Sequence, residues 1–387
     1  MHIEPLVVGC EAHGLHLPTA APSEAEFRQL AEALLQHGLV VLRGQGPGLR
    51  PEHEVALYRR LGSLWTDGPL PLEAAESAAA ADLGLTRGAQ RTFDHRPGGF
   101  AEIGLIGNGV LRGHFGLDGV EMNPAAKHER ANAEWHTDGP SRADDTCVLS
   151  WMTCHAAPTG MPGGVLPRWT TDGGEEVQQR FPAGATLFAS STAAYELAPP
   201  KEQALLRTMR CRYRSLGDNP APAVPASSDP PGARHYPTMD ASGTRPLAPR
   251  AGMESAEATD DSASYTVPLV VRHPHSGRWA VFCEPIRMLR LESVAVSGAS
   301  RALSWDESQE TVARCWRRAI TPDKVLVQDW RPGTIVFWDN RAIIHSRTPT
   351  DCYTGPGDAA RPADQNQRIM HLMRITLPTS VVGTARL

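Results

Sequence analysis

A histidine and an aspartate stand two residues apart in the stretch ANAEWHTDGP, as His136 and Asp138. On an extended chain, side chains at positions i and i+2 point to the same side of the backbone. Such a pair can supply two ligands of a metal ion, but it is also compatible with a salt bridge at a strand end or with a helix cap. Because the chain has 15 histidines, such pairs arise by chance, and a metal site needs a third ligand.

His345 is the candidate for that third ligand. It follows the apolar run GTIVFW and the short polar segment DNR, where the chain can turn toward a cavity. Two histidines and one carboxylate on one face of an octahedral metal leave three positions open, and this arrangement suits non-haem Fe(II) oxygenases. A β-sandwich would bring such distant segments together. Taken alone, His345 is also typical of a surface or core histidine that binds no metal.

Other polar groups in the sequence indicate less. His273 and His275 lie in HPHSGR, which we interpret as a turn between two strands rather than a metal site. His155 and His371 lie in apolar, strand-like segments, where a histidine is usually buried and hydrogen bonded. The segment GQGPG at 44–48 lacks the spacing and the following helix of a phosphate-binding loop.

The elements that must position these residues are short. The sequence predicts a helix capped by Ser23, a buried strand at 39–42, a second helix that stops at Gly62, and a third capped by Ser304 or Asp306. Further strand-like segments are DTCVLSWMTCHAAP, GATLFAS, SYTVPLVV, RWAVFCEP, GTIVFWDN and RIMHLMRITL. Short strands joined by long loops, with few flanking helices, favour a β-sandwich or barrel over an alternating βαβ fold.

Length and composition indicate a globular protein. We interpret its 387 residues as a single domain (1–387), with 41% hydrophobic and 21% charged residues. Residues 215–263 are rich in Pro, Ala, Ser and Gly, which predicts a loop insertion that is partly mobile. The net charge of -5 argues against a nucleic-acid partner, which would need basic residues for its phosphates. No apolar run approaches the roughly 20 residues that span a bilayer, so we expect no membrane partner.

Cysteine usage and the two termini bear on the compartment. The seven cysteines are scattered and form no C-x-x-C pair, which favours reduced thiols. No basic segment followed by an apolar one opens the chain, so no secretory signal is expected. We therefore expect a cytoplasmic protein. The C-terminal Ala-Arg-Leu resembles a peroxisomal address, which makes the peroxisome the alternative. A homo-oligomer is compatible with the sequence.

Five blocks of sequence share their order and character with one protein family. NAEWHTDGP, GATLFASSTAAYELAP, HPHSGR, WRPGTIVFWDNRAIIH and QRIMH resemble the taurine dioxygenase-like (TauD/TfdA) family of Fe(II)/2-oxoglutarate-dependent oxygenases. The segments LLQHGLVVLRGQ and ALYRRLGSL resemble that family's opening, so the resemblance runs from about residue 25 to 377. It implies a mainly β (α+β) chain with a double-stranded β-helix (jelly roll) core, flanking helices and long loop insertions.

The resemblance also implies cofactors and site residues. Fe(II) would be the metal, and 2-oxoglutarate and O2 the cosubstrates. His136, Asp138 and His345 match the iron ligands. Thr186 and Arg368 match the residues that bind the distal carboxylate of 2-oxoglutarate. These residue types suit the task, since a guanidinium binds a carboxylate through two parallel hydrogen bonds and a hydroxyl adds a further donor.

The resemblance also assigns roles to Trp338 and Asn132. Trp338 matches an aromatic residue near 2-oxoglutarate, and Asn132 matches an asparagine close to the substrate. The threonine assignment has competitors in Thr170 and Thr171, because the glycine pair of MPGGV lies far from GATLF here. The match of TLFASSTAAYE favours Thr186.

The sequence departs from the family near its C-terminal arginines. The interval from His345 to Arg368 is longer than in the family, so Arg374, on the same expected strand face, is an alternative clamp for the carboxylate. Leu372 stands four residues after Arg368, where family members that use sulfonates carry an arginine. Taurine and simple alkylsulfonates are therefore not the expected substrates.

The expected function is oxidation of a C–H bond in a small-molecule substrate, with release of succinate and CO2. Hydroxylation is the default outcome, while desaturation, cyclisation and elimination use the same cosubstrates. The alternative is a metal-binding jelly-roll protein without turnover that acts as a binding or regulatory module. A protein or nucleic-acid substrate is a further rival, and the acidic composition argues against nucleic acid.

Overall fold

The computed structural model describes 1–46, 48–65, 95–107, 109–122, 135–138, 145–157, 168–170, 176–178, 181–182, 184–214, 264–283, 288–295, 297–348 and 367–378. The expected insertion at 215–263, Asn132, Thr171 and the C-terminal Ala-Arg-Leu lie outside these residues.

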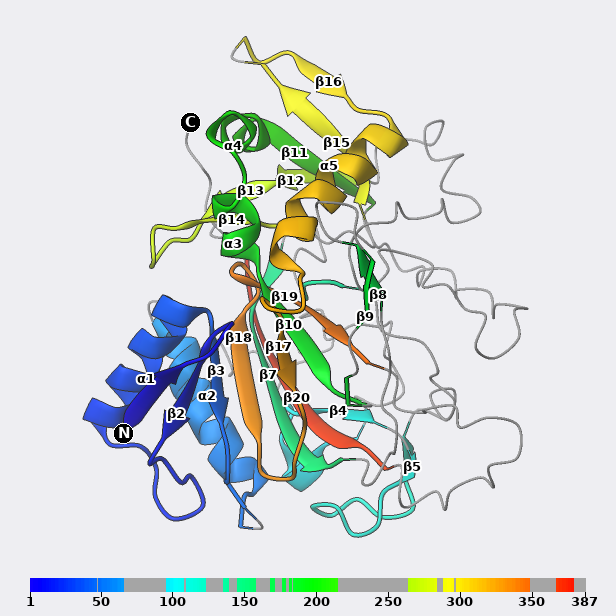
Figure 1. Cartoon of the computed structure of the whole chain (residues 1–387). Helices are drawn as coiled ribbons and strands as arrows, with labels where there is room; N and C mark the ends of the chain where they lie inside the picture. Colours follow the sequence, from blue (N-terminus) through cyan, green and yellow to red (C-terminus); the bar gives the residue numbers. More distant parts are fainter. Residues whose placement is uncertain are drawn as a thin grey trace.

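A seven-stranded sheet forms the centre of the molecule (Figure 1). Its strands, in sheet order, are β1 (His2–Pro5), β2 (Cys10–His13), β3 (Leu39–Leu42), β18 (Ile335–Asp339), β7 (Asp145–Ala156), β20 (Ile369–Pro378) and β4 (Gly104–Gly107). A three-stranded sheet packs against one side of it and consists of β17 (Leu326–Gln328), β10 (Thr186–Ser190) and β19 (Ile343–Arg347).

The remaining elements flank these two sheets. A four-stranded sheet lies at the top of Figure 1 with α3 (Ser191–Glu196), α4 (Pro200–Arg207) and α5 (Trp305–Ala319). Its strands are β12 (Ser264–Pro268), β11 (Met209–Arg214), β15 (Met288–Val294) and β16 (Ser300–Ala302). Two-stranded pairs are β13 (Val270–Arg272) with β14 (Trp279–Val281), β5 (Gly109–Val110) with β6 (Glu121–Met122), and β8 (Arg168–Thr170) with β9 (Glu176–Gln178). Helices α1 (Glu24–His37) and α2 (Pro51–Trp65) lie at the lower left, and a 3-10 turn spans Pro97–Gly99.

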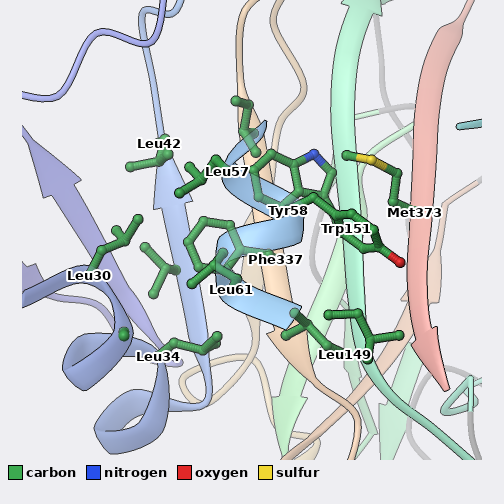
Figure 2. Close-up of a cluster of buried hydrophobic side chains, with 14 of the residues drawn as sticks. Leu30, Leu34, Leu42, Leu57, Tyr58, Leu61, Leu149, Trp151, Phe337 and Met373 are labelled. Carbon is green, nitrogen blue, oxygen red and sulfur yellow. The ribbon is translucent and has the colours of Figure 1, made fainter. Parts of the chain in front are cut away.

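The central sheet is buried on both faces, because its strands alternate side chains between two cores. On the inner face, Met370 and Leu372 of β20 join Trp338 of β18 and Phe188 of β10 in one apolar cluster. On the outer face, apolar side chains of the sheet meet those of α1 and α2. Figure 2 shows this outer cluster, which includes Leu30, Leu34, Leu42, Leu57, Tyr58, Leu61, Trp151, Phe337 and Met373.

The helices follow their sequence signals in two cases and depart from them in one. Ser23 and Ser304 each form a capping box that opens α1 and α5, so Ser304 rather than Asp306 is the cap. The predicted end of α2 at Gly62 is wrong, since the helix runs on to Trp65. A glycine inside a helix costs only about 1 kcal/mol, and the buried Leu57 and Leu61 hold this helix against the sheet.

The two facing sheets and their flanking helices confirm the mainly β architecture with flanking helices. The pairing of β20 with β7 contains one irregularity. The register shifts between Ile369 and Met370, whose partners are Ala156 and Cys154. His155 is therefore the extra residue of a β-bulge, a feature that re-aims side chains.

Candidate functional site

His136 and His345 are joined through their backbones. The amide of each donates to the carbonyl of the other, at N···O distances of 2.8 and 2.9 Å, as an isolated antiparallel bridge. This bridge brings the two imidazoles side by side, with ring centroids 4.2 Å apart. The sequence suggested that His345 follows a turn facing a cavity. In the structure it lies within β19, opposite Phe188 of β10, so a regular strand sets its direction.

Asp138 completes the group from the same segment as His136. One ligand atom each of His136, Asp138 and His345 lies within 4.8 Å of the others, so the structure brings together all three predicted iron ligands. Two side chains of the central sheet hold the carboxylate. Ser150 of β7 donates to its Oδ2 at 2.5 Å, and Nη2 of Arg374 donates to its Oδ1 at 2.5 Å. Each carboxylate oxygen thus has a fixed donor and a lone pair left for a metal.

Asn340 connects these parts, and sequence reasoning missed it. Its side-chain oxygen accepts from the Asp138 amide at 3.3 Å and from the Trp338 indole at 3.0 Å. Its side-chain nitrogen donates to Ser150 at 2.8 Å, and its carbonyl accepts from the Thr137 hydroxyl at 3.0 Å. Asn340 therefore fixes both the segment that carries Asp138 and the hydroxyl that binds it. Its place inside the block FWDNRAIIH was the only signal in the sequence.

The connection between β18 and β19 is held by a buried ion pair. The Asp339 carboxylate accepts from Nε and Nη2 of Arg341, at 2.9 and 2.5 Å, and Nε2 of His273 lies 2.8 Å from it. Asp339, Asn340 and Arg341 are each 1% exposed, so this polar stretch is part of the core rather than a loop in solvent. His273 is buried and contacts Asp339 here.

The electrostatics of the triad favour metal-binding protonation states. Burial alone would raise the pKa of the Asp138 carboxyl, but the Arg374 charge and the two histidines lower that pKa well below its usual range. Burial, together with the neighbouring His136, lowers the pKa of the His345 imidazole to about 3. A carboxylate and a neutral imidazole are the forms that bind metal ions.

The three residues fit an iron site by a direct observation as well. Nδ1 of His345 is buried, and it has no hydrogen-bond partner among the described residues. A buried polar atom of this kind costs about 1–3 kcal/mol, which a metal bond would offset. Two imidazoles and one carboxylate are also the donor set of non-haem Fe(II) oxygenases.

The two residues expected at 2-oxoglutarate lie beside the inner core. Thr186 of β10 is 2% exposed, and its Oγ1 accepts from the Trp330 indole at 2.8 Å, which leaves the hydroxyl proton for another acceptor. Arg368, also 2% exposed, directly precedes β20. Burial raises the pKa of the Cys154 thiol to about 12, and the nearby Arg368 charge opposes that rise. Cys154 and Trp330 belong to the same inner cluster.

A glycine allows the Arg368 backbone to sit where it does. A Cβ at Gly107 of β4 would lie 1.8 Å from the Arg368 carbonyl oxygen, which is far inside van der Waals contact. The strand pair β4–β20 therefore reaches its spacing at this point only because residue 107 has no side chain.

The other predicted residues take different positions. Trp338 is fully buried, its ring centroid lies 5.0 Å from that of His345, and it supports the triad through Asn340. Arg374, the alternative clamp, is 20% exposed in its side chain and forms an ion pair with Asp138. The side-chain contacts of Thr170, on β8, are outside what the structure describes.

Comparisons with known proteins agree with this geometry. A family model described as "Taurine catabolism dioxygenase TauD, TfdA family" matches residues 2–376. An alpha-ketoglutarate-dependent xanthine dioxygenase of Emericella nidulans is 24% identical over 348 residues, covering 84% of each chain. A xanthine dioxygenase with the same dependence from Schizosaccharomyces pombe is 23% identical, covering 90% of this chain and 80% of its own.

Solved structures show the same fold. A taurine dioxygenase from Burkholderia xenovorans superposes with a TM-score of 0.53 at 18% identity, covering 97% of this chain and 90% of the other. The structure of AAD-2 in complex with Mn(II) and N-oxalylglycine gives a TM-score of 0.54 at 16% identity, covering 98% and 100%. Within the described ranges, none of the helices combines the length and apolar character needed to cross a membrane.

Proposed function

The chain belongs to the TauD/TfdA family of Fe(II)- and 2-oxoglutarate-dependent dioxygenases, and we propose that it hydroxylates a C–H bond of a small molecule. One atom of O2 would enter the product as a hydroxyl group, and the other would enter succinate as 2-oxoglutarate loses CO2. The observation that carries this proposal is the convergence of His136, Asp138 and His345 between the two sheets, with the Asp138 carboxylate fixed by Ser150 and Arg374.

In this proposal His136, Asp138 and His345 hold Fe(II). The bound iron supplies the redox chemistry that couples O2 to the cosubstrate. The chain contributes position: the backbone bridge fixes the two imidazoles, and Asn340 fixes the segment that carries Asp138. Donors to a ligating carboxylate keep its orientation and its ionised form, and they typically affect metal affinity by about 10- to 100-fold.

Arg368 and Thr186 would hold the far carboxylate of 2-oxoglutarate. Arg368 is buried beside the inner core, where a guanidinium can bind a carboxylate away from competing water. The Thr186 hydroxyl, which already accepts from Trp330, has a proton to donate. Arg374 is committed to Asp138, so it supports the metal ligand rather than the cosubstrate. This contact favours Arg368 over Arg374 as the clamp.

The substrate class follows from relatives that match most of the chain. Two of them are named as xanthine dioxygenases, so xanthine and other purines are the first candidates for the substrate. Leu372 is 3% exposed and packs in the apolar inner cluster, so no cation stands there for a sulfonate. Taurine is therefore the matched negative reference, and Asn132 is the proposed substrate contact.

The test has two stages that separate binding from turnover. Anaerobic addition of Fe(II) and 2-oxoglutarate is expected to give the weak visible charge-transfer band of the chelate in the native chain but not in Asp138→Ala. Xanthine, other purines and taurine are then compared for stimulated succinate formation, with the product examined by mass spectrometry for one added oxygen atom. Desaturation, cyclisation or elimination would appear instead as a product without that atom.

Two results would overturn the proposal. A chelate band with no substrate-stimulated succinate from any tested metabolite would favour a metal-binding module without turnover. Absence of the band in correctly folded protein would remove the iron and 2-oxoglutarate assignment itself. Arg368→Ala is expected to raise the 2-oxoglutarate KM by about 10- to 100-fold, because a charged hydrogen bond contributes roughly 1.5–3 kcal/mol. An unchanged KM would transfer the clamp to another residue.

A further inference from the structure

A second group of two histidines and a carboxylate lies on the outer face of the central sheet. Glu54 comes from α2, His155 from the bulge in β7 and His371 from β20. Oε1 of Glu54 lies 3.0 Å from Nε2 of His155 and 2.9 Å from Nδ1 of His371, and the two nitrogens are 3.1 Å apart. His371 points away from the inner cluster, because its neighbours Met370 and Leu372 are both part of that cluster.

The three atoms converge on one point instead of spreading over the available acceptors. Both nitrogens approach the same oxygen, Oε1, while Oε2 of Glu54 is buried with no hydrogen-bond partner among the described residues. An ordinary hydrogen-bonded network would use both oxygens and keep two N–H groups apart. A shared cation would account for this geometry, since it would draw the lone pairs of all three atoms toward one centre and would also be within reach of Oε2.

The charge of Glu54 has no fixed counterion in the described part of the chain. Its described side-chain partners are His155 and His371, and both lie at Oε1. Two aspartates with buried carboxylates each pair with an arginine instead, Asp138 with Arg374 and Asp339 with Arg341. A fully buried carboxylate is costly without a cation, and no arginine or lysine pairs with Glu54 among the described residues.

An outer partner for one of the ligands is also in place. Nε2 of His114 lies 2.9 Å from Nε2 of His371, the ring nitrogen that faces away from Glu54. At this distance one ring nitrogen donates and the other accepts, so His114 can accept a hydrogen bond from the Nε2–H of His371. Histidines that bind metals generally donate their second N–H to such a partner. The ring of Phe115 covers His155 and His371, at centroid distances of 5.2 and 5.7 Å.

We propose that Glu54, His155 and His371 form a second metal site, which binds Zn²⁺ and is structural rather than catalytic. Ligand atoms about 2.0–2.1 Å from a tetrahedral zinc lie about 3.3 Å from one another, so spacings of 2.9–3.1 Å need only a small outward movement. The side chains of Glu54 and His371 are 0% exposed and that of His155 is 12% exposed, so water has little access. The ion would fasten α2 to β7 and β20.

The first experiment uses the whole chain with the inner site disabled. His136→Ala and Asp138→Ala are combined, the protein is stripped with a chelator, and Zn²⁺ is then added with removal of the excess. Mass spectrometry of the metal is expected to find about one zinc per chain. Saturating zinc is expected to raise the Tm by about 3–5 °C, as binding to the folded state alone requires.

The second experiment removes the outer ligands in that background. Glu54→Gln and His155→Asn keep the size of the side chains and are expected to abolish zinc retention and the shift in Tm. His114→Asn should weaken zinc binding by about 10- to 100-fold without abolishing it. The matched control is His13→Asn, because His13 also lies beside glutamates, 3.2 Å from Glu4 and 3.7 Å from Glu11, but is exposed.

Spectroscopy with Co²⁺ tests the metal ligands independently of thermal stability. Co²⁺ added to the chain with the disabled inner site should give the intense visible bands of low-coordinate Co²⁺ with nitrogen ligands, and Zn²⁺ should displace them. Failure of the folded inner-site variant to retain zinc or to show these bands would overturn the proposal. Retention of zinc after Glu54→Gln and His155→Asn would overturn it as well, since the ion would then be bound elsewhere.

Discussion

The two faces of the central sheet carry the same donor set in different surroundings. On the inner face, Asp138 joins His136 and His345, and on the outer face Glu54 joins two histidines of β7 and β20. The inner carboxylate has an arginine and a serine as donors, whereas the partners of the outer one among the described residues are histidines. The inner group joins β19 of the three-stranded sheet to β7 and β20 of the central sheet, whereas the outer group joins α2 to β7 and β20.

This difference shows how one set of side chains can serve two purposes. A catalytic metal needs open coordination positions and a carboxylate held in place by other groups, which Arg374 and Ser150 do for Asp138. A structural metal needs closure and is itself the counterion of its carboxylate. The residue types of the three ligands do not distinguish a catalytic from a structural metal site. The residues around the ligands determine which of the two it is.

Neutralising each carboxylate tests the contrast with the largest expected effect. Asp138→Asn removes charge at the inner site and is expected to lower turnover by at least about 10³-fold, because the bound metal contributes several kcal/mol to the barrier. Glu54→Gln is expected to act on the stability of the fold and to lower turnover through loss of folded protein. Succinate formation and thermal unfolding are measured on both variants. Equal losses of specific turnover in fully folded samples would contradict the division.

The sequence predicted that His136, Asp138 and His345 come together, and it predicted His155 and His371 as buried, hydrogen-bonded histidines, but it gave no sign that Glu54 joins them. His136 and Asp138 share a short segment, and His345 follows a clear apolar strand, so local pattern and family resemblance reach them. Glu54 is separated from His155 by 101 residues and from His371 by 317, and only the bulge in β7 and the packing of α2 bring them together. A histidine in an apolar strand gives no sign of such a partner.

Elsewhere in the chain too, features that depend on local contacts were predicted from the sequence, and features that depend on long-range contacts were not. The helix opened by Ser23 was predicted correctly because a capping box is local. The N-terminal strands β1 and β2 were not predicted, since the short, largely polar segment His2–Pro5 becomes a strand only by pairing with Cys10–His13. Asn340 was missed because its function depends on contacts with Thr137 and Asp138, about 200 positions away in sequence, at separations of 203 and 202.

Arg374→Met makes the surroundings of the inner carboxylate resemble those of the outer one, because it removes the arginine donor. The variant keeps most of the aliphatic stem and removes the cation that holds Asp138. We expect Fe(II) affinity to fall by about 10- to 100-fold, as for loss of a donor to a metal ligand. The Fe(II) affinity is measured by titrating the protein with Fe(II) at saturating 2-oxoglutarate and following the chelate band. A raised 2-oxoglutarate KM with unchanged iron affinity would instead assign Arg374 to the clamp.

Gly107→Ala tests whether the edge strand β4 determines the position of Arg368. The added Cβ would overlap the Arg368 carbonyl, so β4 or the start of β20 must move. Misplacement of a binding group by about 1 Å can cost up to about 100-fold, and we expect the 2-oxoglutarate KM to rise about 10-fold. Gly109→Ala is the matched control, because its nearest neighbours are side-chain atoms of Gln367 at 3.5 Å. Equal effects of the two changes would point to loop strain instead.

Tyr58→Phe has the smallest expected effect. It tests whether the outer group on α2 and the inner group are energetically coupled. The Tyr58 hydroxyl, one helical turn after Glu54 on α2, donates to the Arg374 carbonyl at 2.6 Å. Losing that bond should lower the free energy of unfolding by about 1 kcal/mol. If zinc at Glu54 positions α2 and β20, the effect of Tyr58→Phe on iron affinity should differ between chains with and without Glu54→Gln. A double-mutant cycle measures that difference, and additive effects would show that the outer site stabilises the fold without adjusting the inner one.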